Sequence, residues 1–238
     1  MQKQQLLYSG KAKSLFTTDD ENLLIAEFRD DTTAFDGEKH QKLSGKGETN
    51  LAISTHLMNE IENKGIPTHF VKSLSSTECV VKKLKMLPVE CVIRNIATGS
   101  LCRRLGVQQG LSLRPPLFEL FLKNDELHDP LINSDHAISF GWATEAQIAT
   151  MREYTFKLND ILREAFSNAG LILVDAKFEF GIHDGEVYVG DEISPDSCRI
   201  WDALTKEPLD KDRFRQDLGK VVASYQEIAL RLGISLTA

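Results

Sequence analysis

The sequence is poor in cysteine, in long apolar runs and in net positive charge. Its four cysteines form no Cys-x-x-Cys pair, and their spacings match neither a zinc site nor a disulfide framework. We therefore expect reduced thiols in a cytoplasmic protein. No apolar run approaches the length of a membrane span, and the polar N-terminus lacks the apolar core of a signal peptide. These absences argue against a membrane protein and against a secreted, disulfide-stapled one.

The charge balance and the lack of repeats narrow the choice of partners. The chain has 28 Lys and Arg against 35 Asp and Glu, a formal net charge of −7. Binding to a phosphate backbone usually requires a basic face, so we expect no nucleic-acid partner. There is no internal repeat and no low-complexity segment. With 238 residues and 42% hydrophobic content, the chain can build one substantial core or two small lobes that share a cleft.

Strand patterns dominate the first third of the chain, and helical patterns follow, with hairpins instead of βαβ units. This order favours an α+β architecture with two lobes over a Rossmann sheet. The link Met86-Leu87-Pro88 separates two strand patterns and marks a boundary between lobes of residues 1–85 and 86–238. The predicted strands are 6–16, 23–28, 79–84 and 89–93, with a final hairpin over 171–193. The predicted helices are 48–64, 101–105, 145–169 and 212–232.

Two of these helices carry clear end or face signals. Thr144 and Gln147 form the pattern of a capping box, and Gly170 ends the same helix. In the last helix, an apolar stripe that includes Leu218 and Tyr225 is expected to face inward.

The segment 171–181 has the period of a strand, in which side chains alternate between faces. One face is uniformly apolar, and Asp175, Lys177 and Glu179 project from the other. Such a face can be a solvated surface, or it can line a cleft with an acid-lysine-acid series. Leu173 lies on the same face, which keeps the cleft alternative open.

The hairpin that follows offers a second acid. Asp184-Gly185 is a turn signal, and the return strand delivers Asp191. Magnesium usually takes one or two carboxylates together with substrate phosphates, and Glu179 and Asp191 can supply these oxygens from neighbouring strands. A two-residue turn would put Asp191 on the apolar face, whereas a three-residue loop or a bulge at Gly190 would bring it to the Glu179 face.

The loop Gly10-Lys11-Ala12-Lys13 is a weak candidate for phosphate binding. Glycine lets the backbone approach a phosphate and two lysines can neutralise it, but an ordinary hairpin with surface lysines fits the same residues. No Walker loop occurs in the sequence. Lys82, in a valine-rich strand pattern, is a further candidate phosphate contact.

Two arginines lie near other anion-binding signals. Glu90 and Arg94 share one strand face, and Thr98-Gly99-Ser100 then opens a short helix. Ser100 is a good N-cap, and a helix N-terminus preceded by glycine also binds phosphate. Arg199, which follows a Ser-Pro-Asp turn, is either a surface residue or an anion contact.

Together these segments resemble the SAICAR synthases, the phosphoribosylaminoimidazole-succinocarboxamide synthase family. The signature stretches of that family correspond to 87–100 and 173–181, and shorter matches at 10–13, 36–37, 128–130 and 196–201 fall in family order. The resemblance covers nearly the whole chain.

The resemblance implies a two-lobe fold with an ATP-grasp- and kinase-like nucleotide cleft. It implies an ATP- and magnesium-dependent ligase of purine biosynthesis, and by analogy a homodimer. Such an enzyme joins L-aspartate to the carboxylate of carboxyaminoimidazole ribonucleotide (CAIR) through an acyl phosphate. The products are the succinocarboxamide (SAICAR), ADP and phosphate.

The resemblance also implies roles for individual residues. Carried over by motif, Gly10, Lys11, Ala12, Lys13 and Lys82 contact the ATP phosphates, and Met86 lies beside the adenine. Glu179 and Asp191 hold magnesium. Arg94, Ser100 and Arg199 grip the ribonucleotide phosphate, and Glu90, Asp175 and Lys177 surround the reacting carboxylate. Arg215, Lys177 and Asp36 are candidates for binding L-aspartate.

A kinase and a non-catalytic nucleotide sensor are the rival functions. A protein kinase would carry a His-Arg-Asp catalytic loop and an Asp-Phe-Gly motif, and the sequence has neither. A sensor would not need the Asp175-Lys177-Glu179 face together with two separate arginine sites.

Overall fold

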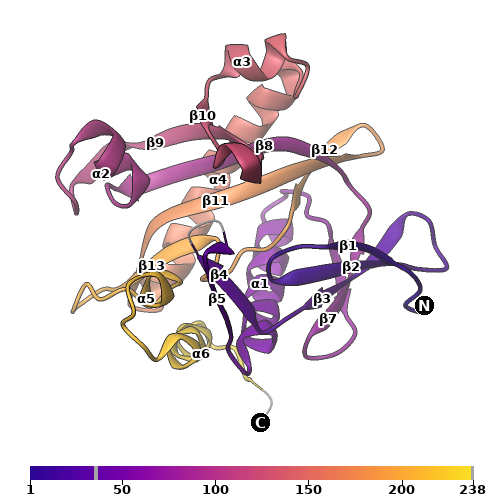
Figure 1. Ribbon diagram of the computed structural model, residues 1–238, viewed down its shortest axis with the longest axis horizontal. Coiled ribbons are helices and arrows are strands. Elements are labelled where there is room, and N and C mark those ends of the chain that lie inside the picture. The colour runs from indigo at the N-terminus through magenta and orange to yellow at the C-terminus, as the bar shows by residue number, and fades with distance from the viewer. Residues whose placement is uncertain (35–36, 237–238) are drawn as a thin grey trace.

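The computed structural model describes residues 1–34 and 37–236, which form three sheets and a set of helices (Figure 1). The strands are β1 (Leu6–Ser9), β2 (Lys13–Thr17), β3 (Leu23–Phe28), β4 (Asp31–Ala34), β5 (Lys39–Lys42), β6 (Phe70–Ser73), β7 (Glu78–Lys82), β8 (Lys85–Ile96), β9 (Ser112–Leu122), β10 (Leu131–Ile132), β11 (Leu171–His183), β12 (Glu186–Gly190) and β13 (Cys198–Asp202). The helices are α1 (Lys46–Asn63), α2 (Ser100–Leu105), η2 (a 3₁₀ helix, Asp125–Leu127), α3 (Ser134–Ser139), α4 (Glu145–Asn168), α5 (Asp212–Arg215) and α6 (Val221–Arg231). The mixed composition and the antiparallel sheets confirm the α+β prediction.

The first sheet has the strand order β1-β2-β3-β7-β6. The predicted hairpin between β2 and β3 is confirmed, with Lys13 opposite Phe28. The single strand predicted over 6–16 is wrong, because a tight turn closed by a 2.8 Å bond from Gly10 N to Lys13 O divides it into β1 and β2. The inward side chains of β3 pack with α1 in the main core.

The second sheet places β8 and β11 at its centre. Its order is β10-β9-β8-β11-β12, and β13 pairs with the same edge of β11 as β12 does, nearer the start of the strand. Met86-Leu87-Pro88 lies within β8 and is not a link, so that detail of the prediction is wrong; the chain passes between the two sheets at Lys83 and Leu84.

Helix α4 covers one face of the second sheet, behind β8 and β11 in Figure 1. Its predicted capping box is confirmed, because Gln147 N donates to Thr144 Oγ1 (3.2 Å) and Thr144 N donates to Gln147 Oε1 (2.8 Å). The buried stripe of α4 meets the apolar face of β11. Side chains fully buried in this layer include Met151, Leu158, Leu162, Phe166, Ala176 and Phe180.

The single helix predicted over 212–232 is wrong. Backbone φ angles are positive at Asp217, Gly219 and Lys220, and this left-handed stretch interrupts the helical hydrogen bonds between α5 and α6. Leu218 is therefore exposed instead of inward, whereas Tyr225 is fully buried as expected.

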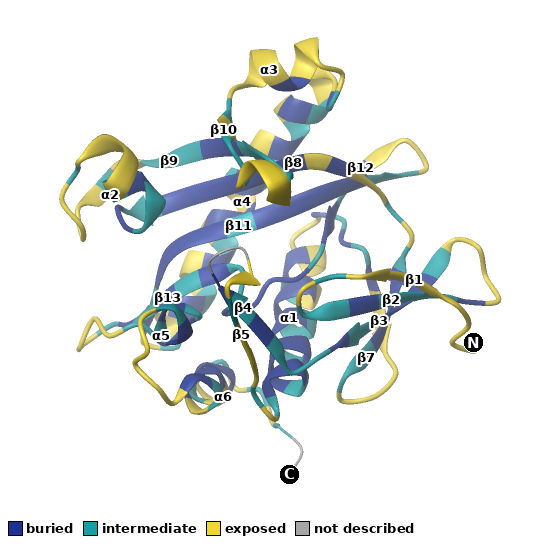
Figure 2. Cartoon of the chain, in the orientation of Figure 1, coloured by how far each residue is buried: buried dark blue, intermediate teal, exposed yellow. Residues whose placement is uncertain are grey.

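Figure 2 shows which parts of the chain are buried and which are exposed. β8, β11, much of α1 and one face of α4 are buried, while α3 is largely exposed. A smaller apolar cluster of Ala34, Phe214, Val221 and Tyr225 joins β4 to α5 and α6. Within the described residues, no helix is both long and apolar enough to cross a membrane.

Candidate active site

The face of the second sheet opposite α4 carries a layer of buried charges. Directly opposite residues of an antiparallel pair share a face, and the register sets Asp175 opposite Arg94 and Glu179 opposite Glu90. Lys177 lies between them on the same face. The exposed fractions are 4% for Asp175, 3% for Arg94, 7% for Glu179 and 8% for Glu90. The acid-lysine-acid face of β11 is thus not a solvated surface.

Lys177 bridges two carboxylates of this layer. Its Nζ donates to Glu90 Oε1 at 2.7 Å and to Glu179 Oε1 at 2.8 Å. Burial alone would lower the pKa of Lys177, but the charges of Glu179 and Glu90 raise it well above its usual value. Lys123, on the loop after β9, pairs with the other oxygen of Glu179. Lys177 therefore stays protonated at neutral pH.

Arg94 is the centre of a second group of charges. Its guanidinium donates to Glu119 Oε2 (2.6 Å), Asp175 Oδ2 (3.0 Å) and Ser100 Oγ (3.2 Å). Ser100 is not the N-cap of α2, contrary to the prediction; Gly99 occupies that position, and no side chain caps the helix. The Ser100 hydroxyl instead faces the arginine.

Arg199 extends this group toward α5. Its Nη1 donates to Asp175 Oδ2 and its Nε to Asp212 Oδ2, both at 2.8 Å, and Arg215 Nη1 donates to Asp212 Oδ1 at 2.6 Å. Ion pairs therefore run without interruption from Arg94 to Arg215. Arg94, Arg199 and Arg215, which we expected to bind the ribonucleotide or L-aspartate, are thus linked through the carboxylates of Asp175 and Asp212. Ser100, also expected in this region, contacts Arg94.

Asp191 reaches this side of the sheet by an unexpected route. The turn has two residues and Glu179 lies opposite Gly190 in regular register, so the predicted three-residue loop or bulge is wrong. The strand ends at Gly190, and the positive φ of Asp191 (55°) redirects the chain. The carboxylate of Asp191 pairs with Lys13, whose Nζ also lies 3.2 Å from Glu192 Oε1.

The charges around Asp191 keep it ionised. Burial alone would raise the pKa of Asp191, but Lys13 and Lys177 hold it well below its usual range. Glu179 and Asp191 both raise the pKa of Lys177, and both contribute to raising that of Lys13. The carboxylates of Glu179 and Asp191 thus act on the same two lysines.

The remaining residues expected at a nucleotide site are less tightly held. Lys11 Nζ lies 2.8 Å from Asp125 on an exposed surface, and Lys82 Nζ donates to Thr68 O at 3.1 Å and lies 5.1 Å from the ring centroid of Tyr188. Met86 is 39% exposed. Ala12 O accepts from Arg29 N. Asp36 lies outside the described residues.

The sequence reasoning missed several charged partners. Glu119 carried a signal, since it is the one charged residue in the apolar run Leu117-Phe118-Glu119-Leu120-Phe121-Leu122. Lys123 and Asp212 carried none. Lys123 meets Glu179 through the pairing of β9 with β8 and of β8 with β11, and Asp212 meets Arg199 because the segment after β13 runs back along that strand.

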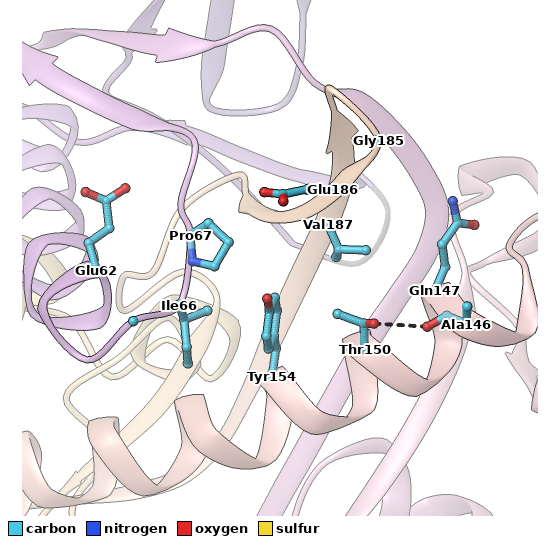
Figure 3. Close-up of a pocket in the computed structure, with 11 residues that line it drawn as sticks. Glu62, Ile66, Pro67, Ala146, Gln147, Thr150, Tyr154, Gly185, Glu186 and Val187 are labelled. Atoms are coloured by element: carbon cyan, nitrogen blue, oxygen red, sulfur yellow. Dashed lines mark hydrogen bonds between the residues drawn. The ribbon is translucent and has the colours of Figure 1, made fainter.

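A separate hollow of about 700 Å³ lies on the other side of the second sheet, beside α4 (Figure 3). Glu62, Pro67, Thr150, Tyr154 and Val187 are among its lining residues. None of the residues predicted for the site lines it.

Comparisons with known proteins agree with one another. Residues 6–232 match the family model of SAICAR synthetase. The phosphoribosylaminoimidazole-succinocarboxamide synthase of Coxiella burnetii is 64% identical over 235 residues, which cover 99% of this chain and 98% of that protein. The crystal structure of the synthase of the same name from Ehrlichia chaffeensis has a TM-score of 0.96 and 40% identity, with 98% of this chain and 100% of that chain covered.

A solved SAICAR synthetase in complex with ADP is also similar, with a TM-score of 0.94, 44% identity and coverage of 97% of this chain and 99% of that chain. The expected resemblance is confirmed over almost the whole length. The chain belongs to the SAICAR synthetase family, the ATP-dependent ligases that join L-aspartate to CAIR in purine biosynthesis.

Proposed function

We propose that the buried charged face of β8 and β11 is the active site of this ligase. The observation that carries the proposal is that two groups of charged side chains meet at this face, one of them completed by Lys13 of β2. Lys13, Asp191, Lys177 and Glu179 form a group suited to phosphoryl transfer. Arg94 and Arg199, joined through Asp175, form a group suited to an anionic substrate.

ATP is proposed to bind between the lobes of residues 1–85 and 86–238. The Gly10-Lys11-Ala12-Lys13 turn and Lys82 would contact its phosphates, and Met86 would lie beside the adenine. The solved SAICAR synthetase with ADP supports a nucleotide site in this fold. Lys13 is the best placed of these residues, because its ammonium is held beside the Asp191 and Glu192 carboxylates.

Magnesium is proposed to bind between Glu179 and Asp191. Within the described residues, no three His, Cys, Asp or Glu side chains form a metal cage. Two carboxylates completed by substrate phosphates suit magnesium, which prefers oxygen ligands and keeps part of its coordination for water or phosphate. When bound, it would offset negative charge on the transferring phosphoryl group.

The arginine group is proposed to bind the ribonucleotide through Arg94, Ser100 and Arg199. Arg215, next in the series of ion pairs, is proposed for a carboxylate of L-aspartate. Asp36 stays a candidate for the same substrate. A guanidinium fork suits phosphate and carboxylate because it can donate two parallel hydrogen bonds.

The reaction follows from two displacements. A carboxylate oxygen of CAIR attacks the γ-phosphorus of ATP and ADP leaves; the amine of L-aspartate then attacks the carbonyl carbon, phosphate leaves and the nitrogen loses a proton.

Lys177 cannot accept that proton because it is already protonated. Burial raises the pKa of Glu90, against the opposing charge of Lys177, so Glu90 is the better base. Lys177 then offsets charge on the reacting carboxylate, and Asp175 holds both arginines.

Release of ADP should depend on both co-substrates. With CAIR, L-aspartate and magnesium-ATP present, ADP should form in step with SAICAR. Omitting CAIR should leave only trace ATP hydrolysis, because the oxygen that accepts the phosphoryl group is missing. Omitting L-aspartate should stall turnover because the attacking amine is missing. Replacing it with L-alanine should also stall turnover, because the missing side-chain carboxylate would leave a cation of the site unpaired. Undiminished ADP release without L-aspartate would indicate a kinase or an ATPase instead.

Arg199→Ala should weaken the ribonucleotide far more than ATP. A charge-assisted hydrogen bond contributes about 1.5–3 kcal/mol, so the KM for CAIR should rise roughly ten- to a hundredfold. Arg231→Ala is the matched control, because Arg231 pairs with Asp202 of the same strand at 2.8 Å but lies outside the charged face. Equal increases in the KM for ATP and for CAIR would contradict the assignment of Arg199 to the ribonucleotide.

Gly99→Ala should produce a milder form of the same defect. A Cβ at position 99 would lie 2.7 Å from Arg199 Nη2, and φ at that position is +59°. We expect a roughly tenfold increase in the KM for CAIR and a loss of about 1–3 kcal/mol in stability. Gly106→Ala, at the other end of α2, has a similar φ of +64° but open space around the Cβ. It should lose stability without any change in the KM for CAIR.

The family resemblance supports two further proposals, a homodimer and a cytoplasmic location. All four cysteines are free thiols, and three of them are buried. This state suits a reducing compartment. Light scattering on the purified chain would measure the assembly directly.

A further inference from the structure

Asp210 is a buried acid that the reaction described above does not use. It lies in the segment between β13 and α5 and is 0% exposed. The segment runs back along β13, since Leu209 N donates to Ile200 O at 2.9 Å, and α5 begins directly afterwards. Asp210 therefore stands where the strand that carries Arg199 meets the helix that carries Arg215.

The two oxygens of Asp210 bind different elements. Oδ2 accepts a hydrogen bond from Ile200 N and Oδ1 accepts one from Asp212 N, both at 2.7 Å. Ile200 follows Arg199 directly in β13. Asp212 is the residue whose carboxylate binds both Arg199 and Arg215. One carboxylate thus binds the backbone N–H of Ile200, next to Arg199, and the backbone N–H of Asp212 itself.

Burial of the Asp210 carboxyl lowers the stability of the protein unless its hydrogen bonds offset the loss of water. Within residues 1–34 and 37–236, Asp210 has no ion-pair partner within 4.0 Å. Burial and the neighbouring charge of Asp212 raise the pKa of Asp210 to about 7. A buried acid without an ion pair lowers stability. A carboxylate has acceptors only, however, and it can satisfy two backbone N–H groups that point at it from different elements.

We propose that Asp210 is a positioning residue that sets the Arg199–Asp212–Arg215 series at the ribonucleotide end of the site. It acts through its bonds to Ile200 N and Asp212 N, and it does not touch substrate. This inference rests on the proposed role of Arg199 in binding the ribonucleotide.

The test compares Asp210→Asn and Asp210→Ala with a matched acid on the same strand. Asp202, at the end of β13, also accepts two backbone N–H groups, from Leu204 (2.8 Å) and Thr205 (2.7 Å), and it pairs with Arg231. Asp202→Asn therefore removes a negative charge on the same strand, away from the charged face, and weakens the pair with Arg231 while Oδ1 can still accept from both N–H groups. Arg199→Ala is measured beside these variants. The readouts are the KM for each substrate, kcat, the melting temperature and the Kd for CAIR by calorimetry without ATP.

Asp210→Asn keeps one acceptor oxygen but turns its amide N–H₂ toward the other N–H group. We expect its Kd and KM for CAIR to rise about tenfold, and those of Asp210→Ala about a hundredfold, with the KM for ATP within about twofold of the unmodified chain. Asp202→Asn should leave the Kd for CAIR unchanged, even if its melting temperature falls as much as that of the Asp210 variants. This graded and substrate-selective loss would support the positioning role.

Three results would overturn it. The first is an equal loss of CAIR and ATP affinity, or a loss of melting temperature alone, in the Asp210 variants. The second is failure of both Asp210 variants to fold, which would assign Asp210 to the stability of the whole chain. The third is unchanged CAIR affinity in Arg199→Ala, which would remove the proposed ribonucleotide site as well. If Arg199→Ala weakens CAIR but the Asp210 variants do not, only the positioning role is lost.

Discussion

Glu179→Gln and Asp191→Asn should each reduce kcat by about a thousandfold at saturating magnesium, because charge stabilisation of the phosphoryl group is worth several kcal/mol. Both substitutions keep the shape of the side chain and remove its negative charge. Glu179 is held by Lys177 and Lys123, and Asp191 by Lys13, so both carboxylates are fixed on one side of the sheet. ADP release and the magnesium concentration for half-maximal rate are the measurements.

Glu186→Gln is the matched control, because Glu186 belongs to the same hairpin but is exposed. It should leave kcat unchanged. The half-maximal magnesium concentration should rise in the two site variants, which separates a metal role from a purely structural one. Circular dichroism should show folded protein in all three. A near-normal rate in Glu179→Gln or Asp191→Asn would remove that residue from the metal site.

The parts of the fold that periodicity and caps specify could be predicted from the sequence. In β11 the alternation of apolar and charged residues sets both faces, because side chains of a strand alternate strictly. In α4 the capping box and the apolar stripe predict its start and its buried face. These are local signals, and they do not depend on which strands become neighbours.

The connections that depend on backbone detail could not be predicted. Asp191 reaches the charged side through a positive φ, and the sequence shows no signal for that conformation at an aspartate. Gly190 suggested a bulge, but the pairing there is regular, and the glycine instead packs closely against the side chains of Leu84 and Met86. The break between α5 and α6 likewise depends on left-handed residues, of which only Gly219 is a recognisable signal.

Pairing between distant strands decides the rest of the site. Arg94 and Asp175 are 81 residues apart, and they meet because β8 and β11 are neighbours in one register. A shift of one residue would move either side chain to the apolar face. Lys123 and Glu179 meet for the same reason, so charge partners follow from topology that the sequence alone does not reveal.

Arg94→Ala should be the most destabilising single substitution on the charged face. Arg94 is 3% exposed, and its loss leaves the buried carboxylates of Glu119 and Asp175 each with one cation fewer. Breaking a buried ion pair by removing one partner typically costs about 3–5 kcal/mol. Glu119 retains Arg104 and Asp175 retains Arg199, so we expect a loss near the lower figure, about 3 kcal/mol, in the free energy of unfolding measured with urea.

The same variant should also bind CAIR poorly, because the Ser100 hydroxyl loses the donor that faces it and Asp175 no longer has a partner on each side. Arg163→Ala is the control for removing an arginine, since Arg163 lies on the exposed face of α4 and its nearest acid, Asp160, is 4.0 Å away. An exposed pair of this kind contributes less than about 1 kcal/mol. If Arg94→Ala loses no more stability than Arg163→Ala, the buried charges must rearrange when the arginine is removed. In that case the ion pairs of this face would not be fixed by their partners, and the preorganised site proposed for the ribonucleotide would have to be abandoned.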